Sequence, residues 1–275
     1  MPGSGVHTET MRGAALPDRP TIPQLTARRI MREASRRELV PGDRLASEPA
    51  LMGFFCVSRG SLREALRTLE FLGAIQTRPG PGGGTRISTP QPRVVGSALA
   101  MALQFRGATL RTVLEARAGV EPQVAGSAAM SRKDQDLAAI DACLARRGGA
   151  LSADGFQRES DHFHRLVAAA AGNEVLSLLV SALTWISTAV EWQHAPATRQ
   201  RLLQEKATVA DAIRARDPRE ATARTAEMFR QALEDLERHQ PQQLAARILW
   251  ADVDELLYPP DGPGKEPKEV QTWTR

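Results

Sequence analysis

The fold of this chain is decided by the stretch Leu45–Ser88, LASEPALMGFFCVSRGSLREALRTLEFLGAIQTRPGPGGGTRIS. Ser47 and Ser58 each precede a run of helical character, and serine is a favoured N-cap because its hydroxyl accepts hydrogen bonds from the first turn. Gly73 follows the second run, where glycine tolerates the left-handed backbone that ends many helices. The glycine-rich segment 79–84 separates two short strand-like runs and predicts a hairpin. Helix, turn, helix and hairpin in this order are typical of domains that place one helix in the DNA major groove and a wing beside it.

The rest of the sequence predicts a mainly α-helical protein, with an N-terminal winged helix-turn-helix of three helices and a small β-hairpin followed by an all-α bundle. The domain plan is a disordered tail over 1–20, the winged helix-turn-helix over 21–89, a linker and linking helix over 90–109, the helical bundle over 110–240 and a partly disordered extension over 241–275. The helices expected in the first domain cover 23–37, 48–54 and 59–72, and the strands cover 74–78 and 85–88. Beyond it we expect helices over 94–105, 110–130, 134–145, 156–171, 175–192, 198–216, 218–238 and 244–257.

Positive charge is concentrated in the N-terminal third. The net charge of the whole chain is only +4. Residues 1–90 carry 13 arginines and eight acidic residues, whereas residues 91–275 carry 23 basic and 24 acidic residues. The excess therefore lies in the domain that is expected to face phosphates.

Cysteine content and hydropathy exclude several classes of protein. Cys56 and Cys143 are the only cysteines and form no CxxC pair, so neither a disulfide framework nor a zinc finger is supported. The start of the chain has no apolar core of a secretory signal, and no apolar run approaches the roughly 20 residues of a membrane span. We therefore expect a soluble cytoplasmic protein without a membrane partner.

The candidate DNA contacts lie on the second helix of the motif and on the hairpin. Arg59 and Arg63 are four residues apart and share one face of the first turns. The planar guanidinium of arginine can bridge the O6 and N7 atoms of guanine, although an arginine pair taken alone is more often a solvated helix face. The other candidates for contact with phosphates or base edges are Arg44, Ser47, Ser58, Ser61, Arg78, Gly83, Thr85 and Arg86.

Residues 21–89 resemble the winged helix-turn-helix of GntR-family bacterial transcriptional regulators. The matching motifs are PGDRLASE (41–48), VSRGSLREAL (57–66), LEFLGAI (69–75) and the glycine wing. The resemblance implies that Arg59 and Arg63 contact bases or backbone. One position departs from the family, which usually has a DNA-contacting arginine after the glutamate of LASE. This chain has Pro49 there, so either one contact is missing or Arg44 or another residue supplies it.

The helical remainder, over about 110–236, resembles the FCD ligand-binding domain of the FadR subfamily. The supporting motifs are LEARAGVEPQVA (114–125), FHRLVAAAAGNEVL (163–176) and AIRARDPREATARTAEMF (212–229). The resemblance implies a homodimeric, ligand-responsive repressor that binds a near-palindromic operator. It also implies a small organic-acid or sugar-acid effector, often bound beside a metal held by one Asp and three His.

Most of the metal-ligand positions that this resemblance implies carry other residue types in this chain. They fall at Ser160, His164, Lys206 and close to Met228, and only His164 is a metal ligand of the expected type. A lone histidine cannot hold a divalent ion that needs three or four ligands. Asp161 is one residue away from the acid's position, which is about 100° of rotation on a helix. We therefore expect no metal and no other cofactor.

A cationic pocket is the alternative that these changes predict. Lys206 and Arg117 can hold a carboxylate themselves, with His164 and Asp161 beside them. The opposing interpretation is that Lys206 lies on the surface and the assignment is displaced by one helical turn. Two further functions stay open: an enzyme with an acid–base site of His164, Asp161 and Glu121, and a non-specific architectural DNA binder. The first lacks a nucleophile elbow, a phosphate loop or a ligand set, so we expect no enzyme, and the near-neutral helical domain disfavours the second.

Overall fold

The computed structural model describes residues 19–250 apart from 79, 81–82, 147–152, 189 and 191, and the side chains of 153–154 are also outside the description. The chain divides into two compact units, residues 1–90 and residues 91–275. Most of the predicted N-terminal tail and the extension beyond residue 250 lie outside the described residues.

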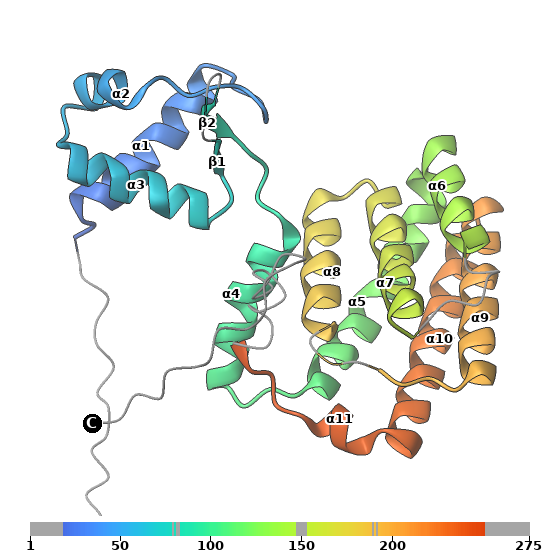
Figure 1. Ribbon diagram of the computed structural model, residues 1–275. Helices are drawn as coiled ribbons and strands as arrows, with labels where there is room; N and C mark the ends of the chain where they lie inside the picture. The colour runs from blue at the N-terminus through green and yellow to red at the C-terminus, as the bar shows by residue number, and fades with distance from the viewer. Residues whose placement is uncertain are drawn as a thin grey trace, which may run out of the picture. The chain divides into compact units, whose positions relative to one another are not determined.

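The N-terminal unit has the predicted order of three helices followed by a hairpin (Figure 1). Its elements are α1 (Ile22–Arg36), α2 (Glu48–Phe55), α3 (Arg59–Phe71), β1 (Ile75–Arg78) and β2 (Gly84–Ile87). The two strands pair antiparallel, with Ile75 opposite Ile87. The predicted winged helix-turn-helix fold is therefore confirmed.

Short-range signals set the ends of these helices. The Ser58 hydroxyl accepts a hydrogen bond from the backbone N–H of Ser61 at 3.2 Å and caps α3 as predicted. Gly73 has a φ of +71° and follows the end of α3, the conformation for which glycine was expected there. Ser47 is the N-cap residue of α2, but its side chain makes no capping hydrogen bond. Pro49 lies in the first turn of α2 and removes one N–H that would need a partner.

The core of this unit forms where α1 packs across α3 and the hairpin closes the end of the domain. The buried apolar side chains are Ala27, Ile30, Ala34, Leu51, Phe55, Leu62, Ala65, Leu66, Leu69, Ala74, Ile75 and Ile87. The apolar residues Leu62, Ala65, Leu66 and Leu69 of α3 recur every three or four positions and face this core, whereas Phe71 at the end of the helix is exposed. The opposite face of α3 is consequently left to solvent.

The second unit is all-helical in the part of the chain that the structure describes, as predicted. Its elements are α4 (Pro92–Phe105), α5 (Leu110–Ser131), α6 (Asp134–Ala145), α7 (Ala153–Ala170), α8 (Glu174–Ser187), α9 (Pro196–Arg214), α10 (Pro218–His239) and α11 (Pro241–Ala245). Figure 1 shows α5 running through the bundle, where it contacts α7, α8, α9 and α10. A core rich in alanine and valine lets these helices approach closely.

The expected linking helix is present as α4, which packs on α8 within the second unit, and a Cβ atom on Gly96 would lie only 2.9 Å from Trp185. Two other predicted helices differ from the structure. The helix predicted over 175–192 ends at Ser187.

The helix predicted over 244–257 is wrong over 246–249, whereas Leu244 and Ala245 lie in α11. Residues 246–249 are non-helical because tertiary hydrogen bonds hold them: Leu110 N–H donates to Ala246 O, and Ile248 N–H donates to Ala108 O, each at 3.0 Å. Its end, 251–257, lies outside the described residues. Within the described ranges no helix is long and apolar enough to cross a membrane.

Candidate nucleic-acid interface and ligand cavity

The solvent face of α3 begins with two of the predicted contact residues. Arg59 and Arg63 are both exposed, one turn apart. The Arg63 Nε lies 4.0 Å from Glu48 Oε2, an exposed pair that water screens, so the guanidinium remains available to a ligand. Arg67 continues the same exposed face one turn later. The sequence analysis missed Arg67. It follows Arg63 by four residues, as Arg63 follows Arg59, so the same spacing would have found it.

The predicted serines hold the start of this helix. Ser58 and Ser61 Oγ atoms lie 3.0 Å apart, and the Ser58 hydroxyl also caps the helix. Their side chains therefore fix the N-terminus of α3, whose free N–H groups and positive dipole favour a phosphate. Ser47 is exposed at the start of α2.

Two of the predicted hairpin arginines support the hairpin itself. The Arg44 guanidinium donates to the Gly83 carbonyl, and the Arg86 guanidinium donates to the Gly42 carbonyl at 2.7 Å. Arg44 thus braces the hairpin, and it does not occupy the position of the reader that Pro49 replaces. Arg78 is exposed on β1, whereas the other hairpin candidates, Gly83 and Thr85, are half-buried.

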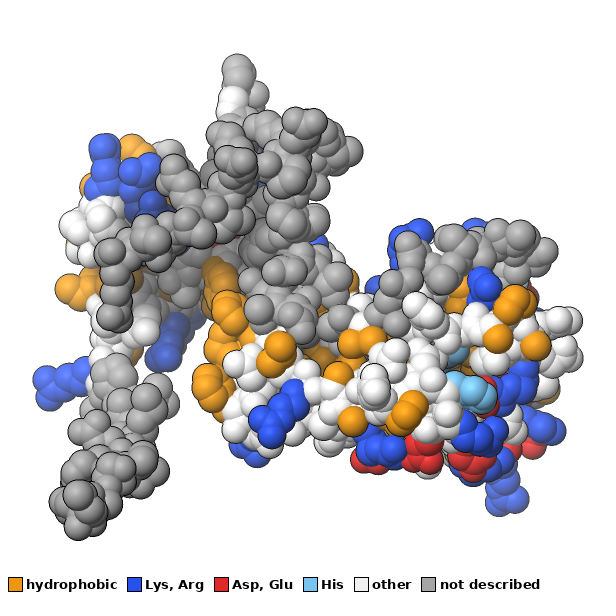
Figure 2. Space-filling view, turned by 60° about the horizontal axis from the view of Figure 1, so that its bottom comes forward, with side chains coloured by type: hydrophobic (Ala, Val, Ile, Leu, Met, Phe, Trp, Pro, Cys, Tyr) orange, Lys and Arg blue, Asp and Glu red, His pale blue; other side chains and the backbone are white. Residues whose placement is uncertain are grey.

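The surface of the two units differs in charge. Figure 2 shows Lys and Arg side chains standing on the N-terminal unit, whereas acidic and basic side chains lie together on the helical unit. This difference matches the distribution of charge along the sequence. The excess of positive charge therefore belongs to the unit that carries the exposed face of α3.

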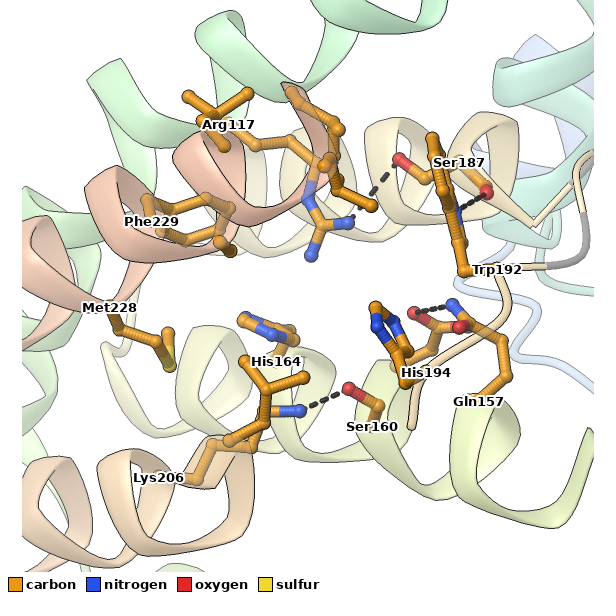
Figure 3. Close-up of a pocket in the computed structure, with 16 residues that line it drawn as sticks. Arg117, Gln157, Ser160, His164, Ser187, Trp192, His194, Lys206, Met228 and Phe229 are labelled. Carbon is orange, nitrogen blue, oxygen red and sulfur yellow. Dashed lines mark hydrogen bonds between the residues drawn. The ribbon is translucent and has the colours of Figure 1, made fainter. Parts of the chain in front are cut away.

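A cavity lies inside the helical unit, with an empty volume of about 660 Å³ when the part open to solvent is counted (Figure 3). Its polar lining comes from α5, α7, α8 and α9, and much of its apolar lining comes from α10. The four residues predicted for the effector site all line it. They are Arg117, Asp161, His164 and Lys206.

Arg117 is held on one side of the cavity by two hydrogen bonds. Its Nε donates to Glu121 Oε1 at 2.6 Å, and its Nη1 donates to Ser187 Oγ at 3.3 Å. The side chain is only 4% exposed, and its guanidinium lies 5.5 Å from the centre of the Phe229 ring. Figure 3 shows the remaining nitrogen directed toward the open space in front of Trp192. A donor with fixed geometry therefore faces that space.

Glu121 connects Arg117 to His164, whose Nδ1 lies 2.6 Å from Glu121 Oε2. Burial is the largest single influence on Glu121 and opposes its ionisation, but the charges and hydrogen bonds of Arg117 and His164 together outweigh burial, and the pKa of Glu121 falls to about 2. Burial lowers the pKa of His164 to about 4, so the imidazole is neutral at pH 7. An ionised carboxylate only accepts hydrogen bonds, so Nδ1 of His164 carries the proton and its Nε2 is left as an acceptor.

Lys206 is buried in the cavity, with 2% of the residue exposed. Its ammonium donates a hydrogen bond to Ser160 Oγ, and it lies 5.9 Å from the centre of the Phe163 ring. The interpretation that Lys206 is a surface residue is therefore wrong. The four positions that the resemblance assigned to metal ligands come together at one cavity: Ser160, His164, Lys206 and Met228.

Asp161 contributes a carboxylate to the same cavity. The residue is 5% exposed, and both of its carboxylate oxygens accept from the Gln157 amide at 3.3 Å. Burial raises the pKa of Asp161, and the charges of Arg117 and Lys206 oppose that rise. The cavity therefore contains both cationic and acidic groups.

The metal-ligand chemistry of this cavity is poor. Lys206 brings an ammonium, which repels a cation, and Met228 brings a thioether, which is a weak ligand for hard divalent ions. Within the described residues no group of three or more His, Cys, Asp or Glu side chains is placed to hold an ion. These residues do not fit an ion held by one carboxylate and three imidazoles.

The sequence analysis missed several residues that line the cavity. They are Gln157, Ser187, Trp192, His194 and Phe229. Trp192 and His194 follow the early end of α8, where Trp192 Nε1 donates to Ser187 O at 3.0 Å. Burial lowers the pKa of His194. No local pattern marks Trp192 and His194, because they lie outside the helices.

Comparison with known proteins agrees with both units. Residues 25–87 match the model of bacterial regulatory proteins of the gntR family, and residues 112–231 match the FCD domain. The chain is 34% identical over 195 residues to the HTH-type transcriptional regulator LutR of Bacillus subtilis (strain 168), covering 68% of this chain and 88% of that protein. It is 31% identical over 194 residues to the HTH-type transcriptional repressor NanR of Klebsiella aerogenes, covering 68% and 74%.

The fold also has a solved counterpart. A Streptococcus agalactiae GntR structure superposes with a TM-score of 0.62, covering 78% of this chain and 99% of that one, at 22% sequence identity. At this identity the similarity concerns the fold alone.

Proposed function

Because this chain belongs to the GntR family of transcriptional regulators and carries an FCD effector-binding domain, we propose that it is a homodimeric, metal-independent repressor released by a small carboxylate. Its domains and relatives are those of regulators and not of enzymes, so the acid–base enzyme with His164, Asp161 and Glu121 is set aside. The FCD match also disfavours an architectural protein that senses nothing. Repression is proposed because the similar NanR proteins are repressors by name.

One observation carries the proposed effector site. Lys206 stands where the family resemblance placed a metal-binding histidine, and it lies in one cavity with Arg117. A bound metal would attract an effector carboxylate by its positive charge. An ammonium and a guanidinium provide the same attraction through charge-assisted hydrogen bonds. The proposed ligand is therefore an organic or sugar acid that binds these two side chains directly.

Metal analysis of the purified protein tests this proposal. We expect far less than one divalent ion per chain after dialysis, and an effector-induced rise in unfolding temperature that EDTA does not change. The matched positive control is the triple variant Ser160→Asp, Lys206→His, Met228→His, which restores the family's ligand types and should retain zinc. A tightly held stoichiometric ion in the unmodified protein would contradict the metal-independent site.

The proposed DNA-binding mode is tested by footprinting. A homodimer presents two copies of α3, so the protected site should be symmetric, with half-site centres separated by about one helical turn or a multiple of it. An acid that raises the unfolding temperature should also weaken protection. An asymmetric footprint, or one that persists in the presence of every stabilising acid, would count against the repressor.

A further inference from the structure

Two basic and two acidic side chains lie in and beside the cavity. Glu121 is bonded to Arg117 at 2.6 Å, and the charges of Lys206 and Arg117 act on Asp161. With all four ionised, the two cations balance the two carboxylates. A ligand of net charge −1 would leave one charge buried without compensation, which is costly in a site of low polarisability. A ligand that carries both charges preserves the balance.

The wall formed by α7 offers acceptors to such a ligand. Asp161 presents a carboxylate, and His164 presents the Nε2 lone pair, because its Nδ1 donates to Glu121. Gln157 donates its amide nitrogen to Asp161, so its amide oxygen is left to accept as well. These groups suit a cationic donor.

The opposite walls offer a cation and apolar surface. Arg117 directs a guanidinium nitrogen into the space, and Figure 3 shows Phe229 beside it and the α7 residues across the opening. Leu114, Leu233 and Leu236 continue the apolar surface along α5 and α10. A ligand with a carboxylate, an adjacent cation and an apolar group would be complementary to this cavity. Its carboxylate would face the cationic side chains, its cation the acceptors of α7, and its apolar group the leucine side chains.

We infer that the effector is an α-amino acid with an apolar side chain, its carboxylate bound by Arg117 and Lys206 and its ammonium bound by Asp161. The inference rests on the proposed function, in which this cavity is the effector site. Burial already raises the pKa of Asp161, so a ligand ammonium beside it would favour the ionised carboxylate. Asp161 therefore determines which class of acid the regulator senses.

Matched ligands test the inference by isothermal titration of the full-length protein. The probes are alanine, valine, leucine and methionine, together with the 2-hydroxy acids of the same carbon skeletons, so that only the ammonium group changes. In the unmodified protein at least one amino acid should bind about tenfold or more tightly than its hydroxy acid, because it gains a charge-assisted bond to Asp161.

Asp161→Asn provides the second arm. It should weaken binding of that amino acid by about tenfold or more, and it should leave binding of the hydroxy acid equal or tighter, because a repulsive carboxylate is gone. Glu174→Gln, which removes an exposed acid at the start of α8, is the matched control and should change neither affinity. If Asp161→Asn does not fold, Gln157→Leu removes the bonds that orient Asp161 and should weaken amino-acid binding selectively.

Three results would overturn the inference. The first is that the hydroxy acid binds the unmodified protein as tightly as its amino acid. The second is that Asp161→Asn weakens binding of the amino acid and of the hydroxy acid equally. The third is that Asp161→Asn tightens binding of both. If other organic or sugar acids bind, and the double variant Arg117→Met, Glu121→Gln stays folded and abolishes that binding, the effector site survives and only the amino-acid class fails. If no acid of any kind binds, the proposed function fails with it.

Discussion

The exposed face of α3 and the cavity of the helical unit both use arginine, but in opposite environments. Arg59 and Arg63 are exposed to water on one helix, and Arg63 makes a loose ion pair with Glu48 at 4.0 Å. Arg117 is buried and bonded to an ionised glutamate. A buried ion pair is coupled to folding because breaking it leaves a charge without compensation, whereas an exposed arginine is not. Changes on α3 should therefore alter binding alone, and changes in the cavity should alter stability as well.

The largest effect is expected for Arg117→Ala. It leaves Glu121 buried without the guanidinium that favours its ionised form, so the free energy of unfolding should fall by about 3–5 kcal/mol in urea denaturation. The double variant Arg117→Met, Glu121→Gln should recover much of this loss. Arg230→Ala, which breaks exposed pairs on α10, is the control and should leave the denaturation midpoint unchanged. An unchanged midpoint in Arg117→Ala would remove the contrast between the two regions.

The next effect is a dependence of stability on pH that arises in the cavity. The pKa of His164 is about 4 when folded and about 6.5 when unfolded, so between these values the unfolded chain binds the additional proton. The His164 contribution is complete above pH 6.5 and is lost as the pH falls toward 4, by about 3 kcal/mol. The raised pKa of Asp161 acts in the opposite direction.

A comparison of variants isolates the histidine from these other groups. Urea denaturation at pH 7 and pH 4.5 should show a smaller change for His164→Gln than for the unmodified protein. His239→Gln, at the exposed end of α10, should retain the full change. Equal pH dependence in His164→Gln and the unmodified protein would show that the histidine is not held neutral by burial.

The DNA-binding face should lose affinity without losing stability. Arg59→Ala and Arg63→Ala should each weaken binding to the selected operator by about 1–3 kcal/mol, measured by fluorescence anisotropy at fixed salt. Their denaturation midpoints should not move, because neither side chain is buried. Arg219→Ala removes an exposed arginine from the helical unit and should leave DNA affinity unaltered. Retained affinity in both α3 variants would exclude this face as the reading surface.

The smallest effect is expected at the hairpin. Arg78 is exposed on β1, where it can contact a phosphate. Arg78→Ala should weaken binding about equally for specific and unrelated sequences and reduce the slope of log affinity against log salt by about 1. A loss confined to the specific sequence would instead make Arg78 a base reader.

Features that depend on residues close together in the sequence could be predicted, whereas features that depend on residues far apart could not. The caps at Ser58 and Gly73 and the apolar spacing of α3 act within a few residues, so the sequence predicts them. The bracing of the hairpin by Arg44 joins residues 39 positions apart, and no local pattern reveals it. For the same reason the extended residues 246–249 were predicted to be helical, although tertiary hydrogen bonds hold them against the end of α4 and the start of α5.

The sequence by itself determined the class of this protein and the identity of its unusual residues. Local propensity specified the winged helix-turn-helix, and the family resemblance located Pro49, Ser160 and Lys206 as departures. Only the tertiary structure decided what Lys206 does there, because burial and contact depend on how α5, α7 and α9 pack. Helix packing brings the ammonium of Lys206 to Ser160, places Arg117 in the same cavity and holds His164 neutral. These contacts depend on distances between helices in the folded structure, and the spacing of residues along the sequence does not reveal those distances.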